Sequence, residues 1–105
     1  MLPQCQILYA PDTLDHMAAI ERKYHSPIRK TIEEQLPYEP NVRTRNRKPL
    51  IKPTRFGMVW ELRFGPQNCF RVFYEIDDTE RTVQVLAIGV KDRNRLLIGG
   101  EEFVL

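Results

Sequence analysis

Residues 58–76 read Met58-Val-Trp-Glu-Leu-Arg-Phe64, Gly65-Pro-Gln-Asn-Cys69 and Phe70-Arg-Val-Phe-Tyr-Glu-Ile76. The first and third of these segments alternate apolar and charged side chains with a period of two, which is typical of β-strands with one buried face. The segment between them contains glycine, proline and asparagine, the residues that favour a turn. The stretch therefore predicts a β-hairpin closed by a five-residue loop.

The loop length sets the register of this hairpin. It places Phe64 opposite Phe70 on one face and Arg63 opposite Arg71 on the other. The aromatic face suits a protein core. Like charges that face each other across a strand pair are destabilising, so we interpret the arginine pair as a site kept for an anion.

The rest of the chain predicts an α+β fold. A short strand over 4–9 precedes a helix over 12–24, capped by Asp12, and a second helix over 26–36 that begins at Ser26-Pro27. The two helices are expected to form an antiparallel hairpin. The central β-hairpin and a last strand over 82–89 complete a three-stranded antiparallel meander, a small twisted sheet with the helices on one face.

Basic residues gather in two places. The proline-bearing loop 37–56 holds six of them and no acidic residue between positions 43 and 55, although the whole chain has a net charge of only +2. Such a stripe is typical of a phosphate-backbone binder, and a solvated loop is the alternative. A second cluster follows the last strand. The candidate RNA-binding cations are Arg43, Arg45, Arg47, Lys52, Arg55, Arg93 and Arg95, with Lys48 and Lys91 beside them.

Alternation also assigns residues to the two faces of the meander. Trp60 and Tyr74 are expected in the core, whereas Phe73 and Val85 are expected to be exposed on the arginine face, where Phe73 could stack on a base. The predicted register puts Ala87 opposite Arg71. A small side chain there would leave room for a ligand.

At 105 residues, the chain is expected to form a single domain over 1–105. Its apolar runs are too short to cross a membrane, and its N-terminus lacks a signal-peptide pattern. Cys5 and Cys69 have no metal-ligand spacing. These features predict a cytoplasmic protein without a bound metal.

The order of elements, together with Lys48-Pro49-Leu50, Trp60-Glu-Leu-Arg63, Phe70-Arg-Val-Phe-Tyr74 and Gly89-Val-Lys-Asp-Arg93, resembles the RelE/ParE superfamily of type II toxins. The resemblance covers nearly the whole chain and implies a RelE-like fold. It also implies a cognate antitoxin protein as partner. Ribonuclease members of the superfamily cut mRNA in the ribosomal A site without a metal or other cofactor, using clustered basic residues and often a tyrosine near the C-terminus.

The resemblance matches the family's basic residues to Arg71, to Arg63 and to Lys91 or Arg93. Two positions differ from the family pattern. Glu61 stands where some members have a lysine, and Leu97 stands where many have the late tyrosine. The resemblance therefore supports phosphate binding more directly than cleavage.

RNA cleavage of this kind needs a base for the 2′-hydroxyl, cations for the developing phosphorane and an acid for the 5′-oxygen. Guanidinium groups at positions 63 and 71 suit the cationic role. Lys91 is a candidate acid, or a base if neighbouring cations lower its pKa. Glu61 or Lys48 is the candidate base, and the alternative for Glu61 is a salt bridge that neutralises one arginine.

Three functions remain open from the sequence. The first is a ribosome-dependent mRNA endoribonuclease that inhibits translation. The second is a ParE-like toxin that inhibits DNA gyrase by binding, although that subgroup lacks the basic set of Arg63, Arg71 and Lys91. The third is a RelE-fold protein that binds RNA, or its own operator with a partner, without cleavage.

Overall fold

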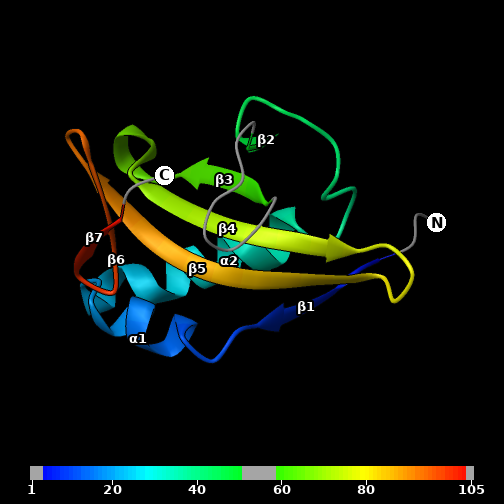
Figure 1. The fold of residues 1–105 in the computed structure, drawn as a ribbon, viewed down its shortest axis with the longest axis horizontal. Helices are drawn as coiled ribbons and strands as arrows, with labels where there is room; N and C mark the ends of the chain where they lie inside the picture. The colour runs from blue at the N-terminus through cyan, green and yellow to red at the C-terminus, as the bar shows by residue number, and fades with distance from the viewer. Residues whose placement is uncertain (1–3, 51–58, 104–105) are drawn as a thin grey trace.

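The computed structural model describes residues 4–50 and 59–103. These residues form seven strands and two α-helices, with two short 3₁₀ segments (Figure 1). In chain order the elements are β1 (Gln6–Tyr9), α1 (Thr13–Ala18), η1 (Arg22–Tyr24), α2 (His25–Gln35), β2 (Arg47–Pro49), β3 (Trp60–Phe64), η2 (Pro66–Asn68), β4 (Phe70–Asp77), β5 (Thr82–Asp92), β6 (Arg95–Ile98) and β7 (Glu101–Phe103).

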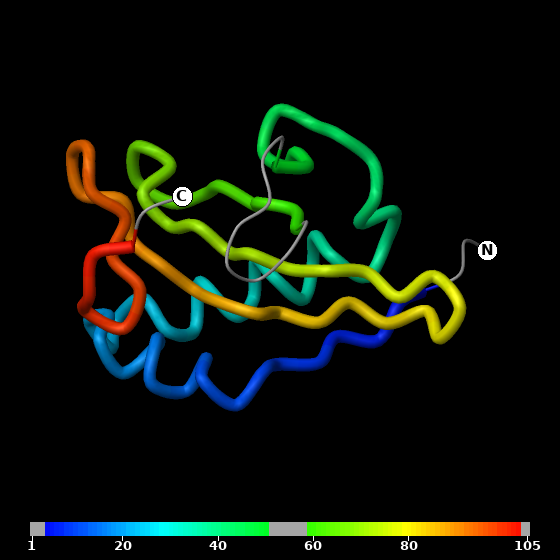
Figure 2. Tube along the Cα trace, viewed as in Figure 1, coloured from blue at the N-terminus to red at the C-terminus, as the bar shows by residue number. Residues whose placement is uncertain are grey.

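All seven strands belong to one sheet. Strands β2 to β7 follow one another in space as they do in sequence, and every neighbouring pair is antiparallel. Strand β1 instead runs parallel to β5, beside Thr82–Val85 (Figure 2). The predicted meander is thus the centre of a larger sheet, extended by β2 within the basic loop and by β6 and β7 near the C-terminus.

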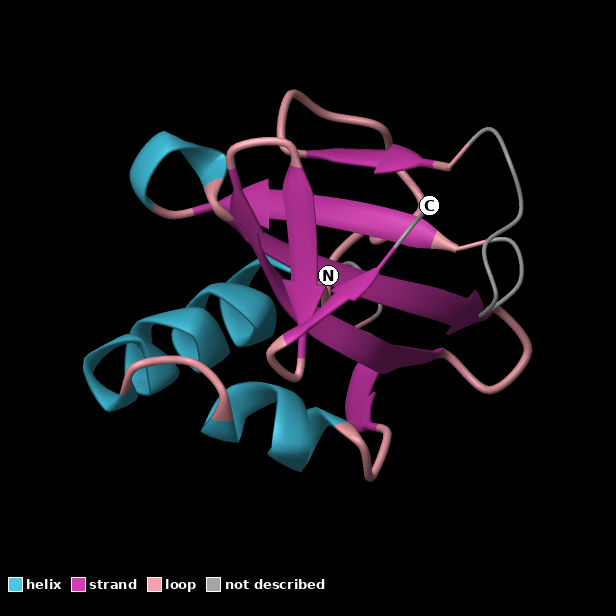
Figure 3. Ribbon diagram, turned by 60° about the vertical axis from the view of Figure 1, so that its left-hand side comes forward, coloured by secondary structure: helices cyan, strands magenta, loops and turns pink. Residues whose placement is uncertain are grey.

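The helices cover one face of this sheet (Figure 3). Ile28, Ile32 and Leu36 of α2 and its C-cap pack against the inward side chains of the central strands, including Leu62 and Tyr74. This confirms the α+β fold class with helices on one face. Helix α1 ends at Ala18, before the predicted end at residue 24, and its Leu14 is 78% exposed. None of the helices in the described ranges is long and apolar enough to cross a membrane.

The opposite face of the sheet carries a second, smaller core. It is formed by Val59, Phe73, Ala87, Leu96 and Ile98, which are all buried. The sequence prediction that Phe73 is exposed is therefore wrong: its side chain lies on the arginine face, but it is only 1% exposed. Leu96 and Ile98 of β6 help to cover it, and this strand lies beyond the predicted three-stranded meander.

A shorter turn and a bulge in β5 each shift the predicted pairing of β4 with β5 by one residue. Tyr74 pairs with Val85 but Phe73 pairs with Ala87, so Leu86 is an extra residue in β5. Asp77 pairs with Thr82, so the turn between β4 and β5 is one residue shorter than the predicted register requires. The shorter turn places Val85 opposite Tyr74 on the helix-covered face, where it is fully buried. The prediction that Val85 is exposed beside the arginines is wrong for this reason.

Helix α1 fills a gap along the outer edge of β5. Strand β1 pairs with this edge up to Val85 and β6 pairs with it from Gly89 onward. Between them, the backbone N–H of Ile88 donates a hydrogen bond of 3.3 Å to Nδ1 of His16 in α1. Burial lowers the pKa of His16, and this effect outweighs the opposite influence of Asp12 and Asp15.

His16 should make the free energy of unfolding depend on pH in the mildly acidic range. Its folded pKa lies below the ordinary value of 6.5, so the unfolded chain takes up the proton first as pH falls. The stabilisation is complete above the unfolded pKa and is lost as pH falls from there toward the folded pKa. We expect wild type to lose more unfolding free energy between pH 7.5 and pH 5.5 than His16→Asn, whose amide oxygen can still accept the Ile88 hydrogen bond. Urea titrations at both pH values measure this difference, and equal losses in the two proteins would contradict it.

Candidate functional site

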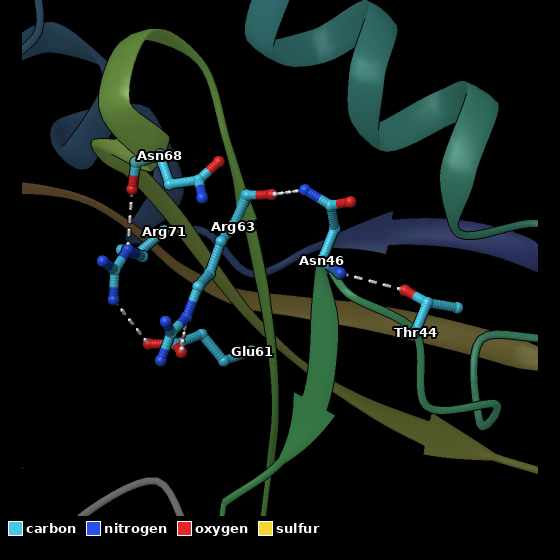
Figure 4. Close-up of polar contacts among 6 residues, drawn as sticks. All are labelled: Thr44, Asn46, Glu61, Arg63, Asn68 and Arg71. Atoms are coloured by element: carbon cyan, nitrogen blue, oxygen red, sulfur yellow. Dashed lines mark hydrogen bonds and ion pairs between the residues drawn. The ribbon is translucent and has the colours of Figure 1, made fainter.

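Three charged side chains meet on the face of the sheet opposite the helices. Arg63 pairs with Arg71 across β3 and β4, which confirms the predicted register of the hairpin. The carboxylate of Glu61 lies between them: its Oε1 is 2.8 Å from Nε of Arg63, and its Oε2 is 3.5 Å from Nη1 of Arg71 (Figure 4). Glu61 therefore bridges both arginines and offsets the repulsion expected for a like-charged pair.

The backbone around the cluster fixes both arginines. Nε of Arg71 donates a hydrogen bond of 2.9 Å to the carbonyl of Asn68 in the hairpin loop. Asn46 holds the strand at Arg63 through two hydrogen bonds. Its carbonyl accepts from the Arg63 N–H at 2.7 Å, and its side-chain amide donates to the Arg63 carbonyl at 3.0 Å (Figure 4). These two asparagines were not among the predicted site residues, since the sequence gives no sign of where a backbone carbonyl points.

Exposure differs sharply among the three charged side chains. That of Arg63 is 34% exposed, that of Arg71 is 11% exposed and that of Glu61 is 3% exposed. A guanidinium group carries a planar fork of N–H donors, and the contacts above use only part of each fork. Arg63 thus offers the more accessible donors to a ligand, with Arg71 and Glu61 beneath it.

Two lysines extend the same face. Lys48 pairs with Glu61 across β2 and β3 and is half-buried. Lys91 alternates onto this face at the end of β5, two residues after Gly89, and is exposed. The structure therefore collects the five predicted catalytic residues (Lys48, Glu61, Arg63, Arg71 and Lys91) on one side of the sheet.

The space predicted beside Arg71 is absent. Because of the shorter turn between β4 and β5 and the bulge in β5, Arg71 lies opposite Gly89 and not opposite Ala87. A methyl group on Gly89 would meet the carbonyl oxygen of Leu97 at 2.9 Å and Cγ1 of Ile98 at 3.0 Å. Strand β6 occupies the space beside Gly89. A ligand therefore has to reach the arginines from the solvent side of this face.

Arg47 was predicted to bind RNA, but the structure gives it another role. It is buried on the helix side of the sheet, and its Nη1 donates to the carbonyl of Gln35 at 2.9 Å, at the C-terminus of α2. A cation at this end of a helix interacts favourably with the helix dipole and its free carbonyls. Arg47 therefore joins β2 to α2 and is not available to a ligand.

The remaining basic residues lie around the cluster or outside the described ranges. Arg43 and Arg45 are exposed in the segment before β2, and Arg93 is exposed in the turn between β5 and β6. Arg95 is exposed and paired with Asp92 at 3.5 Å. Lys52 and Arg55 lie outside the described residues.

Leu97, which stands at the family's tyrosine position, and Tyr74, which was predicted in the core, both face away from the arginines. Leu97 pairs with Val90 and lines a small cavity beside α1 and η1, on the helix side of the sheet. A tyrosine side chain at position 97 would point away from Arg63. Tyr74 is fully buried, as predicted; its hydroxyl donates to the carbonyl of Pro40 at 2.8 Å, and burial raises its pKa.

The fold is similar to those of several solved structures, among them chains from the following two complexes. A chain of the RelBE2 toxin–antitoxin complex of Mycobacterium tuberculosis aligns over 87% of this chain and 94% of its own length, with a TM-score of 0.69 and 21% sequence identity. A chain of the archaeal RelE–RelB complex of Pyrococcus horikoshii aligns over 86% of this chain and 98% of its own, with a TM-score of 0.63 and 14% identity. The chain has the RelE fold.

Sequence comparisons add no closer relationship. No model of a protein family matches the chain, and no curated protein matches it in sequence. At 14–21% identity, these two structures establish the RelE fold and nothing about the chemistry of the site. Any function has to be argued from the residues that this chain places on the fold.

Proposed function

We propose that this protein is the toxin of a type II toxin–antitoxin pair and inhibits translation as a ribosome-dependent, metal-independent mRNA endoribonuclease. One observation carries the proposal: on a RelE fold, Arg63 and Arg71 meet on the face of the sheet opposite the helices, with Lys48 and Lys91 on the same face. Solved complexes of similar chains contain an antitoxin, which supports an antitoxin partner for this chain.

The proposed chemistry divides the cluster by exposure. Arg63 binds the scissile phosphate and stabilises the charge that develops on it, since its guanidinium is the more accessible one. Arg71 supports Arg63 through Glu61. Both carboxylate oxygens of Glu61 are held by guanidinium groups, which favours Lys48 over Glu61 as the base for the 2′-hydroxyl. Lys91, exposed at the end of β5, donates the proton to the leaving 5′-oxygen.

A non-cleaving RNA-binding protein is the second candidate. It is favoured by Glu61, which neutralises part of the arginine cluster, and by Leu97, whose side chain lies on the other face of the sheet. Both candidates bind RNA through Arg63, and they differ in whether the phosphodiester breaks.

Primer extension on mRNA from cells that express the protein distinguishes the candidates. The ribonuclease should produce cuts in phase with the ribosomal A site soon after induction. Arrested growth with intact mRNA would contradict cleavage. In that case, a supercoiling assay with purified DNA gyrase and a binding assay with single-stranded RNA would separate gyrase inhibition from RNA binding.

A further inference from the structure

Glu61 is a buried negative charge inside a site otherwise made of cations. Its side chain is 3% exposed, and both of its oxygens face guanidinium groups. Its neighbour across β2 and β3 is Lys48. A carboxylate in this place is costly for a site that binds anions, because it repels a phosphate that approaches Arg63.

The same carboxylate makes the arginine pair possible. Without Glu61, two guanidinium groups would face each other in adjacent strands with one of them mostly buried. Glu61 accepts from Nε of Arg63 and from Nη1 of Arg71, so it takes donors that an oxyanion would otherwise take. A carboxylate and a phosphate compete for the same geometry on a guanidinium fork.

We propose that Glu61 is an internal counter-ion that stands in for a phosphate group in the ligand-free protein and thereby limits the affinity of the site for phosphate-bearing ligands. The inference rests on the phosphate-binding role proposed above but not on cleavage. In this role Glu61 sets the affinity of the site for phosphate and does not transfer a proton.

Variants that change the charge of the site one step at a time test this role in the purified 105-residue chain. The probe is a fluorescent single-stranded oligoribonucleotide, titrated at several salt concentrations. Glu61→Gln should bind it about tenfold more tightly, as expected for removal of one nearby negative charge, and with a salt slope steeper by about 0.7. Arg71→Gln should bind more weakly than wild type. The double variant Glu61→Gln/Arg71→Gln restores the local charge of the wild type and should bind with nearly wild-type affinity.

Glu34→Gln is the matched control. Glu34 lies on the exposed side of α2, paired with Lys30 at 4.0 Å, in the layer on the other face of the sheet. Its replacement changes the net charge of the protein by the same amount as Glu61→Gln, and it should leave RNA affinity unchanged. Tighter binding by both variants to the same extent would overturn the proposal, because net charge alone would explain it.

Weaker binding by a folded Glu61→Gln protein would also overturn the proposal and would make Glu61 a positioning residue. If Glu61→Gln does not fold, the double variant decides: wild-type affinity supports the internal counter-ion, and a large loss contradicts it. The binding assay contains no ribosome. Tighter binding of Glu61→Gln together with uncut mRNA in cells would therefore contradict the ribonuclease function and leave this inference standing.

Inorganic phosphate provides an independent readout of the same role. In chloride, Glu61→Gln should melt at a lower temperature than wild type, since its two arginines repel each other. Replacing chloride by phosphate at equal ionic strength should raise the melting temperature of Glu61→Gln more than that of wild type or Glu34→Gln. Equal shifts in all three proteins would show that phosphate does not take the place of the carboxylate.

Discussion

Replacing Arg63 with glutamine should lower mRNA cleavage by a factor on the order of 10²–10³, the loss typical when one donor to a developing oxyanion is removed. Of the two arginines that contact Glu61, Arg63 has the more exposed guanidinium, and its strand is held by Asn46. Glutamine keeps a polar side chain on β3 but removes the charge and the fork of donors. The frequency of A-site cuts, measured by primer extension at matched protein levels, gives the effect.

Arg29→Gln is the control for this change. Arg29 is 68% exposed on α2 and pairs with Glu33, so its loss removes the same charge from the helix layer. We expect wild-type cleavage from this variant. In vitro, Arg63→Gln should also reduce the salt slope of RNA binding by about 0.7, the value for one lost phosphate contact on a single strand. A full slope with lower affinity would mean that Arg63 does not touch a phosphate.

The central hairpin could be predicted from sequence because its signals are local. A five-residue turn and strict alternation fix which residues face each other, and the observed pairing of Arg63 with Arg71 follows from them. The second helix, expected over 26–36 from Ser26-Pro27, also follows from local signals, and α2 spans His25–Gln35. These features depend on spacing within a dozen residues, where periodicity determines the side of an element on which each residue lies.

The errors arose where the structure departs from strict alternation or depends on distant contacts. A turn between β4 and β5 that is one residue shorter than predicted moved Val85 to the other face. Together with the extra residue at Leu86, it replaced Ala87 by Gly89 beside Arg71. No residue type in β5 indicates a bulge from the sequence. Arg47 belongs to a run of basic residues that looked like a binding loop, but alternation in β2 directs it to the end of α2. Its role depends on a helix end that lies twelve residues earlier in the chain.

Phe73 is buried and not exposed as predicted, so its replacement should lower the stability of the protein. Phe73→Ala should destabilise the protein by about 3–5 kcal/mol, the usual cost of deleting a buried phenylalanine ring. The ring is 1% exposed and belongs to the small core with Val59, Leu96 and Ile98. Small domains are stable by about 5–15 kcal/mol, so this loss would leave many molecules unfolded at moderate temperature. Urea unfolding followed by circular dichroism measures it.

Phe73→Leu separates packing from base stacking. Leucine restores much of the buried volume and should recover most of the stability lost in Phe73→Ala, because hydrophobic replacements of similar size are tolerated best. It cannot stack on a base as an aromatic ring does. If Phe73 only fills the second core, folded Phe73→Leu binds single-stranded RNA with wild-type affinity. A stable Phe73→Leu protein with markedly weaker RNA binding would instead show that this core opens and presents the ring to RNA, and the arginine face would then extend over β4 toward Ala87, its partner in β5.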